Sequence, residues 1–318
     1  MSARQPGFVE GLCRAVRGEV RPEAPLARYT TYRIGGPATV FLPASPEDAV
    51  AGLRQAHRAG VPVFPLGLGS NVLFPDQGLD ALVIRVGKGM DGARSRDDRW
   101  WLGAGLPAPL AARRTAKEGW AGLHLMVGVP GTVGGGVFMN AGCHGGQWAD
   151  VTVAVTVADF AGNSRVMEAG EIPFQYRRSG LGPVLILEAE VRLTRGDPAG
   201  LGEEVDRLFA WRERGTPFNQ PCCGSVFKNP EPAAPAGWDR PWTAGGLLEA
   251  AGLKGTRVGG AEVSALHANY FVNAGAATAA DVRGLIARAR ETVRARFGVE
   301  LRTEVKIVGE QGEELASD

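Results

Sequence analysis

The stretch Pro65-Leu66-Gly67-Leu68-Gly69-Ser70-Asn71-Val72-Leu73 decides how the first part of this chain folds, because it continues an apolar run, residues 61–66, that is typical of a buried strand. Its two glycines let the backbone approach an anion closely, and Ser70 and Asn71 add hydroxyl and amide donors. Val72 stands where a Rossmann fingerprint needs a third glycine, and no Gly-Lys-Ser/Thr of a Walker loop follows. The stretch predicts a phosphate-binding turn of another kind, although glycines that serve only a tight turn fit it equally well.

A second glycine-rich segment lies further along the chain. It reads Gly128-Val129-Pro130-Gly131-Thr132-Val133-Gly134-Gly135-Gly136 and continues to Asn140-Ala141-Gly142. A glycine-rich turn before a helix of small residues presents backbone N–H groups to an anion. Taken alone, this segment is also compatible with close packing. Two such loops in one strand-rich region favour a dinucleotide cofactor that lies in a groove.

Composition narrows the class of protein. The chain has 318 residues, 44% of them hydrophobic and 22% charged, with a formal net charge of +1. This size suits two or three domains. A net charge near zero, without a block of lysine and arginine, argues against nucleic acid as the main partner. No apolar run is long enough to span a bilayer and the N-terminus lacks the pattern of a signal peptide, so we expect a cytoplasmic enzyme.

The four cysteines predict neither a disulfide framework nor a metal site. Cys13 and Cys143 are isolated, whereas Cys222 and Cys223 are adjacent, which suits neither an ordinary disulfide nor zinc. The pair Cys143-His144 has no second pair of ligands at a suitable spacing. We expect reduced cysteines in or near the core and no bound metal.

Hydrophobic periodicity and turn signals predict an α+β chain. Two helices have clear caps: one begins after Ser45, and one runs over residues 278–297 with Thr278 as N-cap, Asp281 three residues on and Gly298 beyond its end. The other expected helices cover residues 5–18, 107–119, 201–214 and 245–251, and the expected strands cover residues 38–43, 61–66, 82–86, 99–103, 151–158, 184–193, 270–272 and 301–308.

The segment Gly224-Ser225-Val226-Phe227-Lys228-Asn229-Pro230 is the best candidate for a reactive site. It places a hydroxyl, a cation and an amide side by side in a turn that proline closes. Helix and strand interiors do not need this set, whereas a site for an anionic substrate does. A serine in such a turn more often only forms the turn. The candidate gains weight from the two glycine loops before it and from an acidic strand after it.

Eight segments, in this order, resemble the UDP-N-acetylenolpyruvoylglucosamine reductase family over about residues 25–310. Any one of them is weak evidence, but their ordered combination is specific. The segments are Thr31-Tyr32-Arg33-Ile34-Gly35-Gly36-Pro37, 66–74, 129–140, Tyr176-Arg177-Arg178-Ser179, 224–230, Gly252-Leu253-Lys254-Gly255, Gly259-Gly260-Ala261-Glu262-Val263-Ser264 and Glu304-Val305-Lys306.

The resemblance implies an architecture for the whole chain. It gives an FAD-binding region of the vanillyl-alcohol-oxidase (PCMH) type in two α+β halves, residues 28–195, and a C-terminal α/β substrate-binding domain, residues 196–310. An N-terminal extension, 1–27, and a tail, 311–318, complete the chain. Only residues 194–199 separate the long strand from the next helix, so the chain resembles the shorter form without an additional tyrosine loop. Residues 233–242 look like an insertion, which we expect to be a surface loop.

The resemblance also implies the reaction. Members of the family use NADPH, through FAD that we expect to be bound non-covalently, to reduce UDP-N-acetylenolpyruvoylglucosamine to UDP-N-acetylmuramate for peptidoglycan. The expected partners are therefore this UDP-sugar enolpyruvyl ether and NADPH, with no nucleic acid and no membrane, and we expect a monomer. Two alternatives stay open: another FAD-linked oxidase of the same cofactor fold, and a non-catalytic nucleotide-binding module.

The resemblance assigns roles to individual residues. Arg177 would grip the substrate carboxylate, Ser225 would protonate carbon, and Glu304 would complete carboxyl recognition or relay the proton. Without the family motif the sequence does not distinguish Arg177 from Arg178, and Glu304 would be read as an ordinary exposed acid. The expected substrate contacts are Tyr176, Lys228, Asn229 and His267. The expected FAD contacts are Arg33, Leu66, Gly67, Leu68, Gly69, Ser70, Asn71, Val72, Val129, Pro130, Gly131, Thr132, Gly134, Gly135, Asn140 and Gly142.

Overall fold

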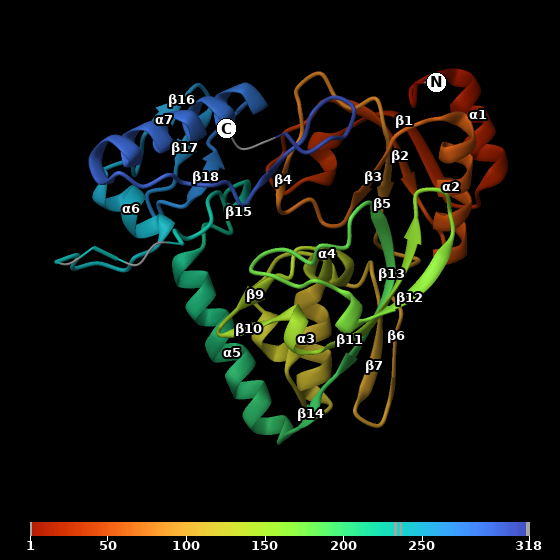
Figure 1. The fold of residues 1–318 in the computed structure, drawn as a ribbon, viewed down its shortest axis with the longest axis horizontal. Helices are drawn as coiled ribbons and strands as arrows, with labels where there is room; N and C mark the ends of the chain where they lie inside the picture. Colours follow the sequence, from red (N-terminus) through yellow and green to blue (C-terminus); the bar gives the residue numbers. More distant parts are fainter. Residues whose placement is uncertain (1, 232–233, 236, 316–318) are drawn as a thin grey trace. The chain divides into compact units, whose positions relative to one another are not determined.

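A computed structural model of the chain describes residues 2–231, 234–235 and 237–315. The chain forms two compact units (Figure 1). The first unit consists of residues 1–24, 38–68 and 80–212, and the second of residues 25–37, 69–79 and 213–318. These units are interleaved along the sequence, whereas the expected FAD-binding and substrate-binding domains are continuous. The functional division at residue 195 stays a prediction, and part of the expected tail, residues 316–318, lies outside the described residues.

The first sheet of the first unit has the strand order β1-β2-β5-β3, in which β2, β5 and β3 are parallel. Helices α1 and α2 pack against each other beside it. The side chain of Ser45 accepts a hydrogen bond from the N–H of Asp48, and α2 ends at Gly60 in the left-handed region, so the expected cap is confirmed. The bounds are α1 Pro6–Ala15, β1 Glu19–Pro25, β2 Pro37–Leu42, α2 Pro46–Ala59, β3 Val63–Leu66 and β5 Leu82–Arg85.

The second sheet of the first unit is antiparallel throughout, with the order β12-β11-β13-β7-β6. Helix α4 packs on β13 and β7, and Trp100 and Trp148 are fully buried in this core. The bounds are β6 Ala93–Arg96, β7 Arg99–Gly103, α3 Ala108–Lys117, α4 Val133–Phe138, β11 Thr152–Asp159, β12 Ser164–Glu168 and β13 Val184–Arg192, and the short pairs are β8 Trp120–Ala121 with β14 Thr194–Arg195 and β9 Gly142–Cys143 with β10 Gly146–Gln147.

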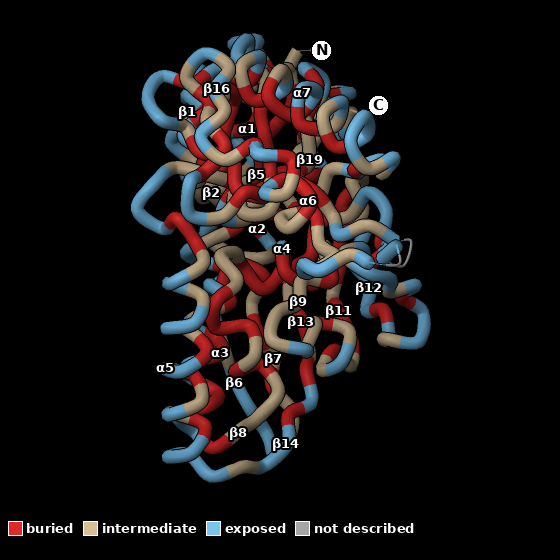
Figure 2. The backbone as a smooth tube through the Cα atoms, turned by 90° about the vertical axis from the view of Figure 1, so that its left-hand side faces the viewer, coloured by how far each residue is buried: buried red, intermediate tan, exposed pale blue. Residues whose placement is uncertain are grey.

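Helix α5, Pro198–Gly215, buries one stripe of apolar side chains. Leu201, Val205 and Leu208 pack with Ala112 and Ala116 of α3. The other residues of α5 are exposed or half-buried, and Figure 2 shows its red and pale blue segments alternating along the helix. Only residues 196 and 197 separate β14 from α5, which agrees with the expected short connection.

The second unit contains a four-stranded antiparallel sheet, in the order β15-β18-β17-β16, with α7 packed on β16 and β17. Helix α7 begins with the expected capping box of Thr278 and Asp281 and ends at Gly298. The bounds are β4 Val72–Leu73, β15 Cys222–Ser225, α6 Ala244–Ala250, β16 Arg257–Val258, β17 Ala261–Val263, β18 Tyr270–Asn273, α7 Ala279–Phe297 and β19 Lys306–Ile307.

The prediction of one continuous strand over residues 301–308 was wrong. Only β19 is a strand, and it pairs in parallel with β4. Just before β19, the N–H groups of Glu304 and Val305 both donate to the carbonyl of Val226, and Thr303 forms an isolated bridge with Phe227. The chain therefore leaves the regular ladder to contact the segment that carries Ser225.

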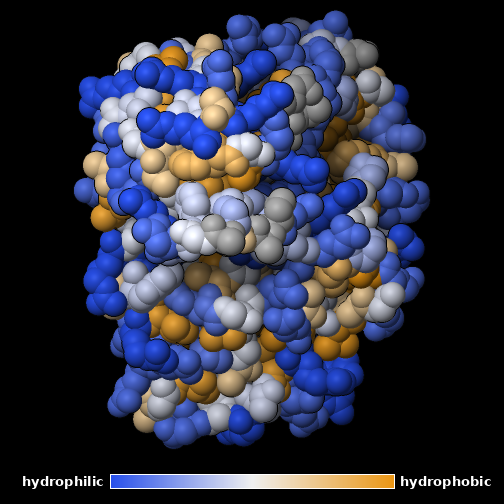
Figure 3. Space-filling view, turned by 60° about the vertical axis from the view of Figure 1, so that its left-hand side comes forward, coloured by the Kyte–Doolittle hydropathy of each residue, from blue (hydrophilic) through white to orange (hydrophobic). Residues whose placement is uncertain are grey.

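Two further expectations concern the surface and the insertion. Among the described residues, no helix combines the length and apolar character needed to cross a membrane, and the face drawn in Figure 3 is largely hydrophilic, with hydrophobic residues in separate patches. Of the expected insertion, residues 233 and 236 lie outside the described residues. Trp238 packs edge-to-face on Trp242 and on Phe297 of α7, with ring centroids 5.0 and 5.4 Å apart, so this part of the segment is anchored to the second unit.

Candidate active site

The part of the first glycine segment that belongs to the first unit, up to Leu68, lies against the second glycine segment. Gly67 follows β3, and a Cβ atom at this position would be only 2.6 Å from Oγ1 of Thr132, in the second glycine segment. A side chain at residue 67 would therefore push the two segments apart. Loops that are far apart in sequence thus form one glycine-lined feature, as a shared dinucleotide ligand would require.

The start of α4 uses most of its own backbone donors. The N–H groups of Val133 and Gly134 donate to the carbonyls of Leu106 and Ala104, at 2.8 and 2.9 Å, and the N–H of Gly135 donates to the side chain of Thr132. A Cβ at Gly134 would meet the Cβ of Ala104 at 2.9 Å, so this glycine is required for packing against the protein itself. Whether Gly134 also contacts a cofactor stays a prediction.

The first glycine loop has donors to offer. In the part of the chain that the structure describes, no protein group accepts a hydrogen bond from the N–H of Gly67, Leu68 or Gly69. Gly69 has a left-handed φ of +71°, which turns the backbone without the steric cost that a side chain would bring. Adjacent free amides in such a turn bind anionic oxygens. The loop therefore fits the pyrophosphate of FAD.

In the second unit, the structure brings together Ser225, Glu304 and Asn71. The N–H of Glu304 donates to the carbonyl of Val226, directly after Ser225, at 2.7 Å. The carbonyl of Glu304 in turn accepts a hydrogen bond from the side-chain amide of Asn71, at 3.2 Å, and the N–H of Lys306 donates to the carbonyl of Asn71. The expected catalytic residue Glu304 and the expected cofactor residue Asn71 thus share one hydrogen-bonded cluster with Val226, the residue after Ser225.

Arg177 lies in the first unit at the tip of a tight turn in which Gln175 and Arg178 form a bridge. It has a left-handed φ of +56°, which is uncommon for a residue with a side chain and is a form of strain found at functional sites. Its Nη2 donates to the carbonyl of Gly142 at 3.0 Å, and its guanidinium lies 4.8 Å from the ring centroid of Tyr176. Arg177 is half-buried and Arg178 is exposed. These contacts orient Arg177 beside the second glycine segment.

The turn around Arg177 is held by a buried asparagine. Asn140 is 1% exposed, has a left-handed φ of +43°, and donates through Nδ2 to the carbonyl of Gln175 at 2.9 Å. Its Oδ1 accepts a hydrogen bond from the N–H of Ala149. The expected FAD residue Asn140 therefore has a structural task within the protein, and its contact with the cofactor stays a prediction.

Comparisons with known proteins agree with this arrangement. The sequence model described as "FAD binding domain" matches residues 37–168, and the one described as "UDP-N-acetylenolpyruvoylglucosamine reductase, C-terminal domain" matches residues 216–308. A UDP-N-acetylenolpyruvoylglucosamine reductase of Rubrobacter xylanophilus is 44% identical over 294 residues, which are 91% of this chain and 95% of that protein. This chain belongs to that reductase family. It is therefore an FAD-dependent oxidoreductase of the α+β class that the sequence predicts.

Two more members of the reductase family support the assignment over nearly the full length. The protein of the same name from Parasynechococcus marenigrum is 42% identical over 306 residues, which cover 93% of this chain and 98% of that protein. The crystal structure of UDP-N-acetylenolpyruvylglucosamine reductase from Thermus caldophilus superposes with a TM-score of 0.74 at 34% identity, covering 92% of this chain and 99% of that one. The fold, and not only the motifs, is that of the family.

Asn269 is a residue of the candidate site that sequence reasoning missed. It is 4% exposed, its Oδ1 accepts a hydrogen bond from the N–H of Phe227 at 2.9 Å, and its Nδ2 donates to the carbonyl of Phe227 at 2.8 Å. Its own carbonyl accepts a hydrogen bond from the N–H of Val226. The amide thus holds the backbone immediately after Ser225 from both sides. Its place between Ala268 and Tyr270, in an apolar run, was the available signal, because a buried amide must find partners.

The other expected substrate contacts differ in how free their side chains are. Asn229 accepts a hydrogen bond from the N–H of Ala244 at the start of α6. His267 accepts one from the N–H of Asn269, and its ring lies edge-on to Tyr270 with centroids 5.0 Å apart. Both residues therefore have structural tasks in the second unit. Lys228 is half-buried, with its N–H bonded to the carbonyl of Arg302.

The remaining expected residues differ in how far they are exposed. Arg33 is exposed, with a left-handed φ of +57°. Tyr176 is 52% exposed and is therefore accessible to a ligand. The expected FAD residues Leu66, Val72, Val129, Pro130, Gly131 and Gly142 are buried or half-buried. Their contacts with FAD stay predictions.

The cysteines are free, but they do not all lie in or near the core. Cys223 is buried, Cys143 and Cys222 are half-buried, and Cys13 is exposed, so the expectation was wrong for Cys13. Burial raises the pKa of the Cys223 thiol well above its usual range. That thiol is therefore inert near neutral pH.

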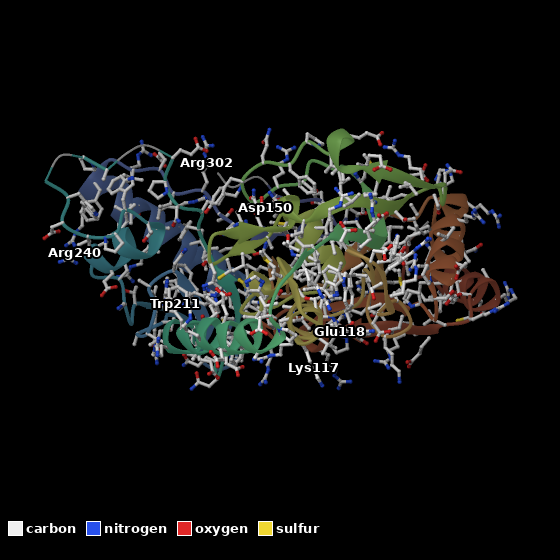
Figure 4. The ribbon with its side chains drawn as sticks, turned by 90° about the horizontal axis from the view of Figure 1, so that it is seen from below. Lys117, Glu118, Asp150, Trp211, Arg240 and Arg302 are labelled. Carbon is white, nitrogen blue, oxygen red and sulfur yellow. The ribbon has the colours of Figure 1, made fainter. Side chains whose placement is uncertain are left out.

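The pair Cys143-His144 does not form part of a metal site in the described chain. The His144 ring instead lies edge-on to the exposed side chain of Trp211, with ring centroids 5.2 Å apart. Trp211 belongs to α5, where Figure 4 labels it. Burial, and then the charges of Arg212 and Arg207, lower the pKa of His144. We therefore expect a neutral imidazole at pH 7.

Proposed function

We propose that this chain reduces UDP-N-acetylenolpyruvoylglucosamine to UDP-N-acetylmuramate with NADPH, in the synthesis of peptidoglycan precursors. The observation that carries the proposal is the cluster in which the carbonyl after Ser225 accepts the N–H of Glu304, next to Asn71 of a glycine loop. A hydroxyl, a carboxyl group and a cofactor loop are the parts that such a reduction needs. An FAD-linked oxidase or a nucleotide-binding module would not require this combination.

Arg177 is proposed to bind the carboxylate of the enolpyruvyl group. Reduction adds hydride to one carbon, and negative charge then develops on the carboxylate as an enolate. A planar guanidinium can donate two parallel hydrogen bonds to a carboxylate and stabilise that charge. The bond from Nη2 to the carbonyl of Gly142 and the contact with Tyr176 limit the rotation of Arg177. Because the guanidinium of Arg177 is already oriented, little energy is needed to reorganise it when the enolate forms.

Ser225 is proposed to donate the proton to the neighbouring carbon. A hydroxyl is a weak acid, so its alkoxide must be stabilised where it forms. Lys228, three residues on in the same turn, is the candidate cation, and Asn269 and Glu304 hold the backbone on the far side of Ser225. Glu304 is proposed to complete carboxyl recognition or to relay the proton back to Ser225.

The residues proposed to hold FAD are the free amides of Gly67, Leu68 and Gly69, together with Ser70, Asn71, Thr132 and Gly135. When bound, FAD accepts hydride from NADPH and supplies hydride to the substrate carbon. We propose that it is held non-covalently, because donors of this kind need no bond to the flavin. Acid precipitation should then release the yellow colour into the supernatant, and colour that stays with the pellet would contradict this point.

The experiment that tests the function follows flavin absorbance without oxygen. We expect purified protein to be yellow, to be bleached by NADPH, and to regain its colour when UDP-N-acetylenolpyruvoylglucosamine is added, with formation of UDP-N-acetylmuramate by mass spectrometry. Re-oxidation by oxygen, with no response to the enolpyruvyl substrate, would instead identify an oxidase. Protein that binds nucleotide but is never bleached would identify a binding module.

We further propose that the protein works as a monomer in the cytoplasm. Its four free cysteines suit a reducing compartment. Residues 28–195 are proposed to form the FAD-binding domain and residues 196–310 the substrate-binding domain. Light scattering during size-exclusion chromatography should give the mass of one chain, and cell fractionation should place the protein with soluble enzymes. A dimer mass or a membrane fraction would contradict the respective statement.

A further inference from the structure

Thr31 connects two segments that are far from it in sequence. Its N–H donates to the carbonyl of Gly69 at 3.1 Å. Its hydroxyl donates to the carbonyl of Cys222 at 2.6 Å and makes a longer contact, 3.4 Å, with the carbonyl of Gly69. All three residues belong to the second unit. The hydroxyl bond is short for an O–H donor and a carbonyl, which indicates a strong interaction. Thr31 therefore ties the first glycine loop to the strand β15.

Each of these segments needs an external support. Gly69 and Gly224 both have left-handed φ angles, +71° and +78°, so the backbone turns at a residue without a side chain. Strand β15 pairs with β18 at Cys222 and at Ser225, but its register shifts between these two residues. The ladder alone does not fix the path from Cys222 to Ser225. The hydroxyl of Thr31 holds the beginning of this path.

The segment around Thr31 also supports the glycine loop. A Cβ at Gly69 would overlap the carbonyl of Tyr29 and lie 2.8 Å from the Cα of Thr30, so the loop rests directly on residues 29–31. A shift of this segment would move the glycine loop and the start of β15 together. Loss of the hydroxyl would remove the short bond to Cys222 and the longer contact with the carbonyl of Gly69, whereas the backbone N–H of Thr31 would still hold the glycine loop.

We propose that Thr31 is a positioning residue for the reduction, which sets the place of Ser225 relative to the flavin-binding loop. This inference rests on the proposed role of Ser225 as the proton donor. Proton transfer to carbon requires the two atoms to be held at close range, and a misplacement of about 1 Å can cost about 100-fold in rate. Thr31 acts through the backbone of Cys222 and does not itself touch the substrate in this scheme.

The first test compares three variants in anaerobic stopped flow. Thr31→Val keeps the branched shape and the backbone bond to Gly69 but removes the hydroxyl, whereas Thr31→Ser keeps the hydroxyl. Thr30→Val is the matched control, because the hydroxyl of Thr30 bonds within its own turn, to the carbonyl of Ile34. We expect Thr31→Val to leave bleaching by NADPH near normal and to slow re-oxidation by the substrate by about 10- to 100-fold. Thr31→Ser should restore most of the rate.

Two outcomes of this test would overturn the inference. Equal slowing of both half-reactions in Thr31→Val would mean that the hydroxyl supports the fold or the FAD site in general. Equal effects in Thr30→Val and Thr31→Val would mean that any lost hydroxyl in this turn has the same result. A slow Thr31→Ser variant would likewise show that the hydroxyl is not the group that matters.

A second measurement does not depend on activity. Hydrogen exchange followed by mass spectrometry should show faster exchange in peptides that cover residues 222–227 in Thr31→Val, with little change in Thr31→Ser or Thr30→Val. Unchanged exchange in these peptides would overturn the link between Thr31 and β15. If the wild-type flavin were not re-oxidised by the enolpyruvyl substrate, the proposed function would be wrong, and the exchange result would still decide the structural link.

Discussion

The surroundings of Gly67 and Gly136 in the first unit and those of Ser225 in the second unit are built in opposite ways. In the first unit, the segments pack closely because side chains are absent: a Cβ at Gly67 would press on Thr132, and one at Gly136 would overlap the indole nitrogen of Trp148. In the second unit, the segments are held by side chains that bond to the backbone. Asn269 and Thr31 bond on either side of Ser225, and Asn71 bonds to the carbonyl of Glu304.

This difference between close packing and hydrogen bonding predicts which substitutions damage each segment. Where close packing defines the segment, adding one methyl group is the damaging change, because dense interiors have no room for it. Where hydrogen bonds define the segment, removing one polar atom is the damaging change, because its buried partner is left unsatisfied. The segments around Gly67 and Gly136 should therefore be sensitive to insertion of atoms, and the segment around Ser225 to deletion of donors and acceptors.

The largest expected effect tests the second unit. Ser225→Ala removes the proposed proton donor, and a positioned general acid contributes about 10²- to 10⁴-fold. We expect re-oxidation of reduced flavin by the substrate to slow by that amount, while bleaching by NADPH stays near normal. Ser264→Ala is the control, since that hydroxyl accepts a bond from the N–H of Leu266 within its own turn. Equal slowing of both half-reactions in Ser225→Ala would show that Ser225 shapes the site and does not donate the proton.

A smaller effect is expected from the arginine of the first unit. Arg177→Lys keeps the charge but loses the planar fork, so the two-point grip on the carboxylate is lost. A hydrogen bond to a charged group is worth about 1.5–3 kcal/mol, which predicts a loss of about 10- to 100-fold in the substrate half-reaction. Arg178→Lys, at the exposed neighbour, should have little effect. If the two variants behave alike, the assignment of the carboxylate to Arg177 fails.

The affinity for FAD tests the close packing between the two glycine segments at Gly67. Gly67→Ala places a methyl group 2.6 Å from Oγ1 of Thr132 and should force the two glycine segments apart. Overpacking costs about 1–3 kcal/mol, so we expect the Kd for FAD to rise by about tenfold or more. Gly87→Ala is the control, because the nearest atom to its new methyl group would be 3.7 Å away, on Arg85. Fluorescence titration measures both, and an unchanged Kd in Gly67→Ala would place FAD elsewhere.

The smallest effect concerns the cap of α7 in the second unit. Thr278→Ala removes the side-chain acceptor for the N–H of Asp281 and should lower the free energy of unfolding by about 1 kcal/mol. Thr292→Ala, which loses only a bond to the preceding turn at Arg288, should be near neutral or slightly stabilising because alanine favours helix. Urea denaturation measures the difference. Equal stabilities of the two variants would show that the cap contributes nothing to this unit.

Much of the fold was readable because its signals are local. The caps at Ser45 and Thr278 lie within one helical turn of the groups they bond. The glycine loop after β3 is recognisable because its glycines stand within a few residues of each other, directly after an apolar run. Strands such as β12 were missed because their burial does not alternate: of residues 164–168 only Met167 is buried. An exposed edge strand carries no apolar pattern for the sequence to show.

The candidate site was predicted only as separate residues. Ser225 and Glu304 were recognised through family motifs, but nothing local indicated that the carbonyl of Val226 joins them. The prediction of a strand over residues 301–308 was wrong for the same reason. The backbone N–H groups of Glu304 and Val305 donate to Val226, a residue far away in sequence, and not to a neighbouring strand. Gly134 illustrates the reverse problem: the sequence shows a glycine but not which neighbour, here Ala104, requires it.

The second unit is assembled from three separate stretches of chain, residues 25–37, 69–79 and 213–318. During synthesis the first two stretches leave the ribosome long before the third exists, so Thr31 and Asn71 are without Cys222 and Glu304 for most of translation. Contacts between such distant residues require large loops to close first, which slows folding. A fragment that begins near residue 213 would lack both early stretches, and with them the hydrogen bonds that Thr31 and Asn71 make to the carbonyls of Cys222 and Glu304.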